Sequence, residues 1–221
     1  MKVMSKKVAV VLSGCGVFDG AEIYESVLTL LRLAESGAEV SVFAPNIPQM
    51  HVVNHLTGEV IEGETRNVLT EAARVVRGEI SDVASAKADE FDALVVPGGF
   101  GAAKNLSDFA VKGGDLTVNE DFLAFAKAFH SAQKPIGLIC IAPAMAAKIC
   151  GEGAQCTIGN DADTAAAINA TGAQHCDCLV TEFHFDETNK LVTTPAYMLA
   201  GSITEAATGI NKLVDKVLSL V

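Results

Sequence analysis

The chain of 221 residues lacks Trp, and aromatic side chains make up only 5% of it. Acidic residues outnumber basic residues by 27 to 16, which gives a formal net charge of −11. Binding of nucleic acid or of an anionic membrane surface relies on clustered Lys and Arg, and this balance disfavours both. No apolar run approaches the ~18 residues of a membrane-spanning helix. We therefore expect neither nucleic acid nor a membrane among the partners.

Cysteine is also sparse. Six Cys in a chain of this length are far fewer than a disulfide scaffold contains. The start of the chain, Met1–Lys7 followed by the apolar run Val8–Leu12, is too short for an export signal and is not followed by a small-residue cleavage pattern. We therefore expect a cytoplasmic protein with reduced thiols. An organelle, reached with a transit peptide that has been trimmed, stays open as an alternative.

Short apolar runs, by contrast, are frequent, and half of all residues are hydrophobic. Runs of this kind form strands that are buried on both faces of a parallel sheet. We predict strands at 8–12, 39–44, 92–96, 135–139 and 191–194, with others near 157–158 and 178–185. Between them, apolar residues three and four apart predict helices at about 21–36, 65–77, 117–129, 142–149, 163–170 and from 202 onward.

Two of these helices are expected to start at capping boxes, Thr117–Glu120 and Ser202–Glu205. The alternation of strands and helices predicts a three-layer α/β sandwich with a mostly parallel sheet. With no linker or repeat in the sequence, we interpret residues 1–221 as one domain. Ligands of such sheets bind beyond the carboxyl ends of the strands, so the residues that follow each strand are the candidates for a site.

The sharpest candidate is Cys140, at the junction between the strand 135–139 and a helix opened by Pro143. A tight turn at such a junction projects a nucleophile above the sheet. The start of the following helix favours a thiolate over a thiol, and its free amides can hold an oxyanion. A buried Cys that only packs is the alternative, because most Cys behave as small hydrophobes.

Two further segments follow strands. Pro97–Gly101 contains glycines that let the backbone approach a ligand and direct amides at an anion, although a plain tight turn explains it equally well. Glu22 and Glu25 lie one turn apart at the start of the first helix. Either carboxylate is favourable there for the helix alone, and either could instead point into a site.

These segments together resemble the DJ-1/PfpI superfamily of class I glutamine amidotransferase-like proteins. The closer resemblance is to its ES1/ElbB branch, the enhancing lycopene biosynthesis proteins. The residues that carry it span nearly the whole chain: Leu12–Gly20, Asn54–Glu59, Pro97–Leu106, Cys140–Met145 and Thr193–Leu199. The resemblance implies a flavodoxin-like fold, a homodimer, and a family link to isoprenoid biosynthesis.

The resemblance also implies a cofactor-free, metal-free glyoxalase, a lyase that converts glyoxal or related small dicarbonyls to hydroxy acids. In this scheme Cys140 forms a hemithioacetal with the substrate and Glu25 moves the proton. The amides of Gly99 and Ile141 hold the oxyanion. Two adjacent negative groups repel, so we expect Glu25 to have a raised pKa and to donate a proton to a Cys140 thiolate of lowered pKa.

Other residues have weaker claims. Many relatives carry a His about twenty residues after the Cys, where this chain has Gly159-Asn160-Asp161, and the nearest alternative base is His184. Cys15 follows the first strand, where it could tune Cys140, form a disulfide with it, or simply pack. A function of another class also stays open. A non-catalytic redox or stress-response protein would use an oxidisable Cys140.

Overall fold

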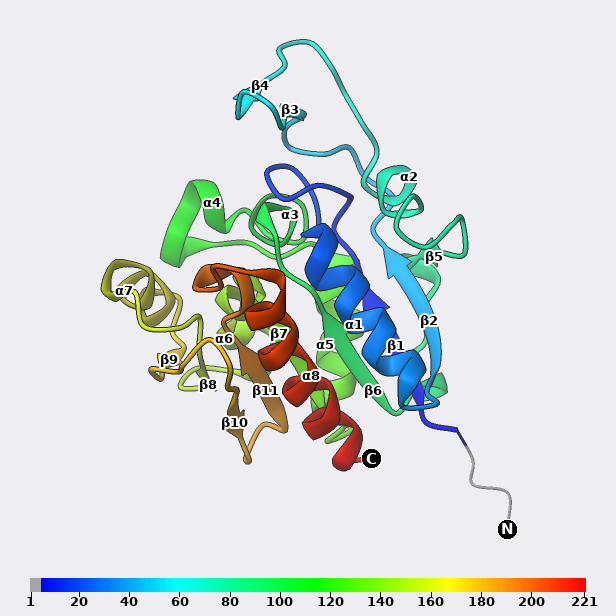
Figure 1. Ribbon diagram of the computed structural model, residues 1–221, viewed down its shortest axis with the longest axis vertical. Coiled ribbons are helices and arrows are strands. Elements are labelled where there is room, and N and C mark those ends of the chain that lie inside the picture. Colours follow the sequence, from blue (N-terminus) through cyan, green and yellow to red (C-terminus); the bar gives the residue numbers. More distant parts are fainter. Residues whose placement is uncertain (1–4) are drawn as a thin grey trace.

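The computed structural model describes residues 5–221, so the first four residues of the segment that was compared with an export signal lie outside it. Its centre is a seven-stranded sheet with the strand order β10-β11-β7-β6-β1-β2-β5 (Figure 1). Every neighbouring pair is parallel except β10 with β11. The strands are β1 (Lys7–Val11), β2 (Glu39–Ala44), β5 (Ser81–Asp82), β6 (Ala93–Val96), β7 (Ile136–Ile139), β10 (His184–Asp186) and β11 (Leu191–Thr194).

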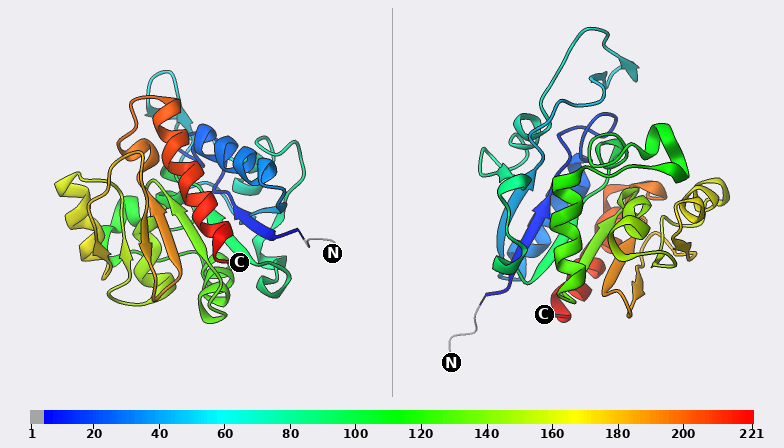
Figure 2. Two further views of the ribbon diagram at one scale, coloured as in Figure 1. Left: turned by 60° about the horizontal axis from the view of Figure 1, so that its bottom comes forward. Right: turned by 180° about the vertical axis from the view of Figure 1, so that it is seen from behind.

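Helices cover both faces of this sheet, because alternate residues of each central strand point to opposite sides. Val8 and Val10 belong to one core cluster, and Ala9 and Val11 belong to the other. The first cluster packs under α1 (Ile23–Glu35), α2 (Val68–Ala72) and α8 (Ile203–Ser219). The second packs under α5 (Glu120–Ser131), α6 (Ala146–Cys150) and α7 (Ala162–Ala170) (Figure 2). The predicted three-layer, flavodoxin-like sandwich is confirmed.

Short elements at the ends of the strands complete the chain. Two small sheets pair β3 (Val53–Asn54) with β4 (Glu59–Val60) and β8 (Gln155–Cys156) with β9 (Gln174–His175). The helices α3 (Phe100–Lys104) and α4 (Phe109–Lys112) follow β6. Apolar periodicity does not predict α3 or α4, because each helix has only about one turn and is too short to show a repeat. Both contribute to the candidate site described below.

Three sequence expectations need correction. The helix predicted over 65–77 is only α2, because Val75 and Val76 are β-branched and pack against the core from turns. The strand predicted over 178–185 shrinks to β10 and shifts toward the turn. The Thr194 hydroxyl donates to the Glu182 carbonyl at 2.7 Å and takes the place of further ladder bonds. The strand near 157–158 lies instead at β8.

One of the two predicted capping boxes is wrong. At α5 the N-cap is Asn119, whose side chain accepts a bond from the amide of Phe122 at 3.0 Å, and Thr117 lies outside the helix. Asn caps as well as Thr does, and Asn119 is the residue placed at the turn. At α8 the N-cap is Ser202, as predicted, with its hydroxyl accepting from the amide of Glu205.

Candidate active site

Cys140 occupies a strained turn directly after β7. Its φ angle is +63°, a left-handed conformation that non-glycine residues rarely adopt. The Cys140 amide donates to the carbonyl oxygen of Thr194 at 3.0 Å, which ties the turn to the end of β11. The side chain is only 6% exposed. The surrounding strands therefore maintain a conformation that costs about 1–3 kcal/mol, as expected for a nucleophile elbow.

Gly98 and Gly99 provide the space beside this turn. A Cβ atom on Gly98 would lie 2.4 Å from Cβ of Cys140 and 3.0 Å from Oε2 of Glu25. Gly99 has φ +85°, and its own Cβ would lie 2.4 Å from the Glu22 amide nitrogen. The glycines after β6 are thus required for the close approach of α1 to Cys140, and the interpretation as a plain turn is insufficient.

Glu25 is fully buried on the face of α1 that points at Cys140. One carboxylate oxygen accepts the Gly98 amide at 2.9 Å, and the other accepts the Tyr197 amide at 3.2 Å. Burial raises the pKa of Glu25 to about 7, and the charge of Glu22 adds to the rise. The amides of Tyr197 and Gly98 and the Cys140 thiol act in the opposite direction. The expected rise in the Glu25 pKa is confirmed.

The pKa of the Cys140 thiol is raised, whereas the sequence predicted that it would be lowered. Burial raises it well above its ordinary value, and the charge of Glu25 raises it further. The amides of Gly99 and Ile141 bond to the sulfur and lower the pKa, but burial prevails. The helix that was expected to stabilise a thiolate begins as a four-residue 3₁₀ turn, Ala142–Met145, and α6 then has only five residues. The expected low-pKa Cys140 is therefore wrong.

Glu22 is the second carboxylate near the site, and it caps α1. Its Oε2 atom accepts the amide of Glu25 at 2.6 Å, and only 8% of the residue is exposed. Burial raises the pKa of Glu22, while the amides of the first helical turn lower it. Both interpretations of Glu22 therefore hold, since it stabilises the helix start and also lines the site.

A pocket of about 320 Å³ opens beside Cys140. Parts of the chain that are far apart in sequence form it: the loop after β1, α3, α4, the Cys140 turn, α7 and the segment after β11. Most of its lining is apolar, including Val17, Phe100, Ala103, Phe109, Ile141 and Met198. Glu22, Thr164 and Tyr197 are the polar residues at its wall. Four of the lining residues, Cys140, Glu22, Gly99 and Ile141, were expected at the site. The other lining residues could not be predicted, because they come from segments that are far apart in sequence.

The remaining candidates lie apart from this pocket. Cys15 is half-buried, and the charged groups that shift its pKa are Glu71, Arg74 and Asp19. His184 sits on the edge strand β10 opposite Thr193, and neither His184 nor Cys15 lines the pocket. Burial lowers the pKa of His184. The structure therefore brings together Cys140, Glu25, Glu22, Gly99 and Ile141, and it does not bring Cys15 or His184 to them.

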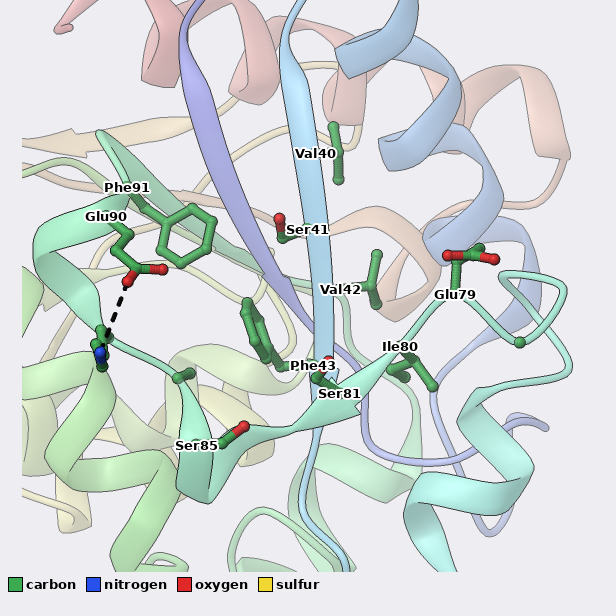
Figure 3. A pocket seen from close by; sticks show the side chains of 13 residues that line it. Val40, Ser41, Val42, Phe43, Glu79, Ile80, Ser81, Ser85, Glu90 and Phe91 are labelled. Carbon is green, nitrogen blue, oxygen red and sulfur yellow. Dashed lines mark ion pairs between the residues drawn. The ribbon is translucent and has the colours of Figure 1, made fainter.

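A larger hollow of about 490 Å³ lies elsewhere, at the open edge of β2 (Figure 3). Its wall includes Ser41, Glu79 and Phe91, and Lys87 and Glu90 form an exposed ion pair of 3.9 Å across part of it. It contains neither Cys nor His. The chemistry therefore assigns the site to the smaller pocket beside Cys140, and volume does not decide it.

Across residues 5–221, no group of three or more His, Cys, Asp or Glu side chains is arranged to hold a metal ion. All six cysteines are free thiols. Within the same described range, no helix combines the length and the apolar character needed to cross a membrane.

The model of the DJ-1/PfpI family matches residues 6–197, which include Glu25, the Gly98–Gly99 turn and Cys140. The chain belongs to the DJ-1/PfpI family. It is 52% identical to glutamine amidotransferase-like class 1 domain-containing protein 3, mitochondrial, from Homo sapiens, over 97% of this chain and 83% of that protein. It is 51% identical to the ES1 protein homolog, mitochondrial, from Rattus norvegicus, over 97% of this chain and 84% of that protein.

Solved structures agree with this assignment. An isoprenoid biosynthesis protein with an amidotransferase-like domain from Ehrlichia chaffeensis superposes with a TM-score of 0.91 at 35% identity, over 98% of this chain and 99% of that one. DJ-1beta from Drosophila melanogaster, at 23% identity and a TM-score of 0.55, shares the fold. The expected resemblance to the ES1/ElbB branch is confirmed.

One expectation is contradicted by these relatives. The human and rat proteins are both named as mitochondrial, which conflicts with the expected cytoplasmic location. The sequence argument rested on the absence of an apolar export signal. Mitochondrial import uses an amphipathic, Arg-rich segment, so that absence does not separate the cytosol from a mitochondrion.

Proposed function

We propose that the protein is a cofactor-independent glyoxalase-type enzyme that converts small dicarbonyls to hydroxy acids through a hemithioacetal on Cys140. The observation that carries the proposal is the contact between Cys140 and Glu25 at the base of the pocket. A nucleophile and a proton-transfer group within hydrogen-bonding reach are the two parts that this isomerisation needs.

The direction of the pKa shifts assigns the starting positions of the protons. The thiol of Cys140 has a raised pKa, so it holds its proton, and Glu25, with a pKa of about 7, is substantially ionised at neutral pH. Glu25 therefore acts first as a general base, not as a proton donor to a thiolate. It takes the thiol proton as the sulfur attacks the aldehyde carbon, which places the negative charge on the carbonyl oxygen.

Later steps use the same two groups. The amides of Gly99 and Ile141, which bond to the sulfur in the free protein, can hold the oxyanion that forms next to it. The oxyanion takes a proton to give the hemithioacetal. Glu25 then moves a proton from the former aldehyde carbon to the neighbouring carbon, which leaves a thioester at the first and an alcohol at the second. Water cleaves the thioester, releases the hydroxy acid and regenerates the thiol.

The experiment is turnover of glyoxal by the purified protein, with glycolate measured. We expect many turnovers per protein for the wild type, and a loss of at least about 100-fold for Cys140→Ala and for Glu25→Gln. Cys156→Ala is the matched control, since Cys156 is a buried thiol outside the pocket. Wild-type turnover in Cys140→Ala would refute the proposal.

The redox or stress-response alternative is less well supported. Oxidation requires an accessible thiolate, and Cys140 is almost fully buried with a raised thiol pKa. The glyoxal assay separates the two functions, because a sensor would give at most one stoichiometric modification.

The relative from Ehrlichia chaffeensis is named an isoprenoid biosynthesis protein. Common isoprenoid precursors are diphosphates, which Lys and Arg normally bind. Among residues 5–221, neither Lys nor Arg lines the pocket. We therefore propose that any link of this protein to isoprenoid output is indirect.

We further propose a homodimer. Helix α1 exposes an apolar stripe whose residues are one turn apart. Ile23, Val27 and Leu31 are 43%, 47% and 52% exposed. A helical stripe of this kind is self-complementary about a two-fold axis, and a second copy of the chain is the partner that always presents it. Light scattering tests this proposal. We expect a dimer for the wild type and a monomer for Val27→Glu, and a monomeric wild type would refute it.

A further inference from the structure

Two segments that the sequence singled out, Leu12–Gly20 and Asn54–Glu59, meet in the structure outside the pocket. The second of them has no part in the proposed reaction. It belongs to an arm, residues 49–66, which includes β3 and β4 and projects from the body of the molecule (Figure 1). From the hairpin of this arm, His55 reaches back to the loop after β1. The contact raises the question of what His55 does there.

The ring of His55 makes two hydrogen bonds that fix its tautomer. Its Nδ1 atom lies 3.0 Å from the Val53 carbonyl oxygen, and its Nε2 atom lies 3.2 Å from the Phe18 amide nitrogen. Because a carbonyl oxygen only accepts, we assign the ring proton to Nδ1, and Nε2 accepts the Phe18 amide. Gly16 lies directly against the ring, since a Cβ atom there would be 2.8 Å from Nε2. His55 therefore holds the loop by a hydrogen bond and by packing.

Two charged residues hold the same loop from other directions. Asp19 is 2% exposed, and its Oδ2 atom accepts the Val53 amide of the arm at 2.8 Å. Its Oδ1 atom lies 3.8 Å from Nε2 of His55. Lys104, on α3, donates to the Phe18 carbonyl at 2.9 Å. The loop is thus clamped between the arm and α3, and His55 is the residue of the arm that binds its backbone.

The loop in turn supports the glycine turn that faces the thiol. The Phe100 amide donates to the Val17 carbonyl at 2.8 Å. A Cβ atom on Gly99 would lie 2.5 Å from the Gly20 carbonyl oxygen, so the loop packs directly on this turn. The Gly99 amide bonds to the sulfur of Cys140 and is one of the two amides proposed to hold the oxyanion. The position of that amide therefore depends on the loop.

From these contacts we infer that His55 is a positioning residue: it accepts the Phe18 amide, holds the loop after β1, and through this loop fixes the Gly99 amide that faces Cys140. Its effect on turnover rests on the proposed function, whereas the contacts do not. An oxyanion forms only as the substrate reacts, so poor placement of its donor should lower kcat more than it raises KM. Small displacements of such a group are costly to the rate.

Four variants separate the hydrogen bond from the bulk of the ring. His55→Leu removes the acceptor and keeps an apolar side chain of similar size. His55→Ala removes the same acceptor with less bulk, which covers a poor fit of Leu. His55→Gln is the matched control, because its Oε1 atom reaches about as far as Nε2 and accepts the same amide. Leu56→Ala is the second control, since Leu56 is the next residue of the arm and is 97% exposed.

The first experiment measures the pH profile of Cys140 alkylation by iodoacetamide, followed by mass spectrometry. The Gly99 amide lowers the pKa of the Cys140 thiol, whereas burial and the charge of Glu25 raise it. When the Gly99 amide is less well placed, the midpoint should move to higher pH. We expect a rise of about 0.5 pH unit or more in His55→Leu and His55→Ala, and the wild-type midpoint in His55→Gln and Leu56→Ala. An unchanged midpoint in His55→Leu and His55→Ala, or an equal rise in His55→Gln, would overturn the inference.

The second experiment measures kcat and KM for glyoxal. In His55→Leu we expect kcat to fall by at least about fivefold with KM within about twofold of the wild type, and His55→Gln to restore kcat. Turnover by the wild type with an unchanged kcat in His55→Leu would overturn the inference and leave the proposed function standing. If the alkylation midpoints shift as expected while even the wild type does not turn over glyoxal, the role of His55 stands and the proposed function fails.

Discussion

The carboxylate of Glu25 lies within hydrogen-bonding reach of the Cys140 thiol, and its negative charge raises the pKa of that thiol. The two groups come from α1 and from the turn after β7, and both are buried. Because burial disfavours charge on either group, the pair carries no more than one negative charge at neutral pH, and that charge resides on Glu25. This arrangement makes Glu25 a base toward Cys140.

The first prediction concerns the reactivity of Cys140. In Glu25→Gln the neighbouring charge is absent, so the thiol pKa falls and the pH at which Cys140 alkylation is half-maximal moves to lower pH. A pH–rate profile with iodoacetamide measures this shift. Glu22→Gln is the control, since Glu22 is not among the groups that shift the Cys140 pKa, and we expect a smaller change. An unchanged or higher midpoint in Glu25→Gln would contradict the assignment.

The second prediction concerns the pH dependence of stability. The pKa of Glu25 is raised from its ordinary 4.5 to about 7, so between these values the folded state holds a proton that the unfolded state has lost. This contribution is fully present below about pH 4.5 and is lost as the pH rises through about 7. Its size is about 3 kcal/mol at most.

Urea unfolding at about pH 4 and about pH 8 checks this sign. Glu25→Gln is neutral at both values, so the free energy of unfolding of the wild type should fall more from acid to alkaline pH than that of the variant. The difference between the two falls should approach about 3 kcal/mol. Equal falls in wild type and variant would show that Glu25 is not buried as an acid of raised pKa.

The third prediction concerns the space beside Cys140. In Gly98→Ala the new methyl group would lie 2.4 Å from Cβ of Cys140, so either α1 or the elbow must shift. We expect a loss of about 1–3 kcal/mol of stability together with a large loss of activity. Gly201→Ala is the matched control, because the nearest atom to its new methyl group, on Glu205, is 3.5 Å away. Similar effects of the two substitutions would be evidence against the packing described.

The fourth prediction tests the corrected start of α5. Asn119→Ala removes the side-chain bond to the Phe122 amide and should reduce the free energy of unfolding by about 1 kcal/mol. Thr117 is exposed and lies outside the helix, so Thr117→Ala should change stability by less than about 0.5 kcal/mol. Chemical denaturation of the two variants measures both values, and a larger loss for Thr117→Ala would favour the capping box that the sequence suggests.

Apolar runs in the sequence predicted the central strands well. The predicted runs 39–44, 92–96, 135–139 and 191–194 correspond to β2, β6, β7 and β11 within a residue, because strands that are buried in a parallel sheet are mostly apolar. The predictions fail where the end of a strand depends on a hydrogen bond to another segment of the chain. The strand predicted over 178–185 is shortened because the Thr194 hydroxyl donates to the Glu182 carbonyl. A bond between two segments cannot be predicted from the local sequence of either one. The assignment of the whole chain to one domain stays a prediction.

The site divides in the same way. The sequence by itself determined that Cys140 follows a buried strand, since this follows from the position of the strand end. It left Glu22 and Glu25 open as the carboxylate that points into the site, and the resemblance to the family favoured Glu25. Only the tertiary structure decided the protonation of the pair. A helix of useful length after Cys140 would favour a thiolate, but the chain forms a 3₁₀ turn there and buries the sulfur beside a carboxylate. The apolar pocket wall also could not be predicted from the sequence, because its residues meet only after six segments fold together.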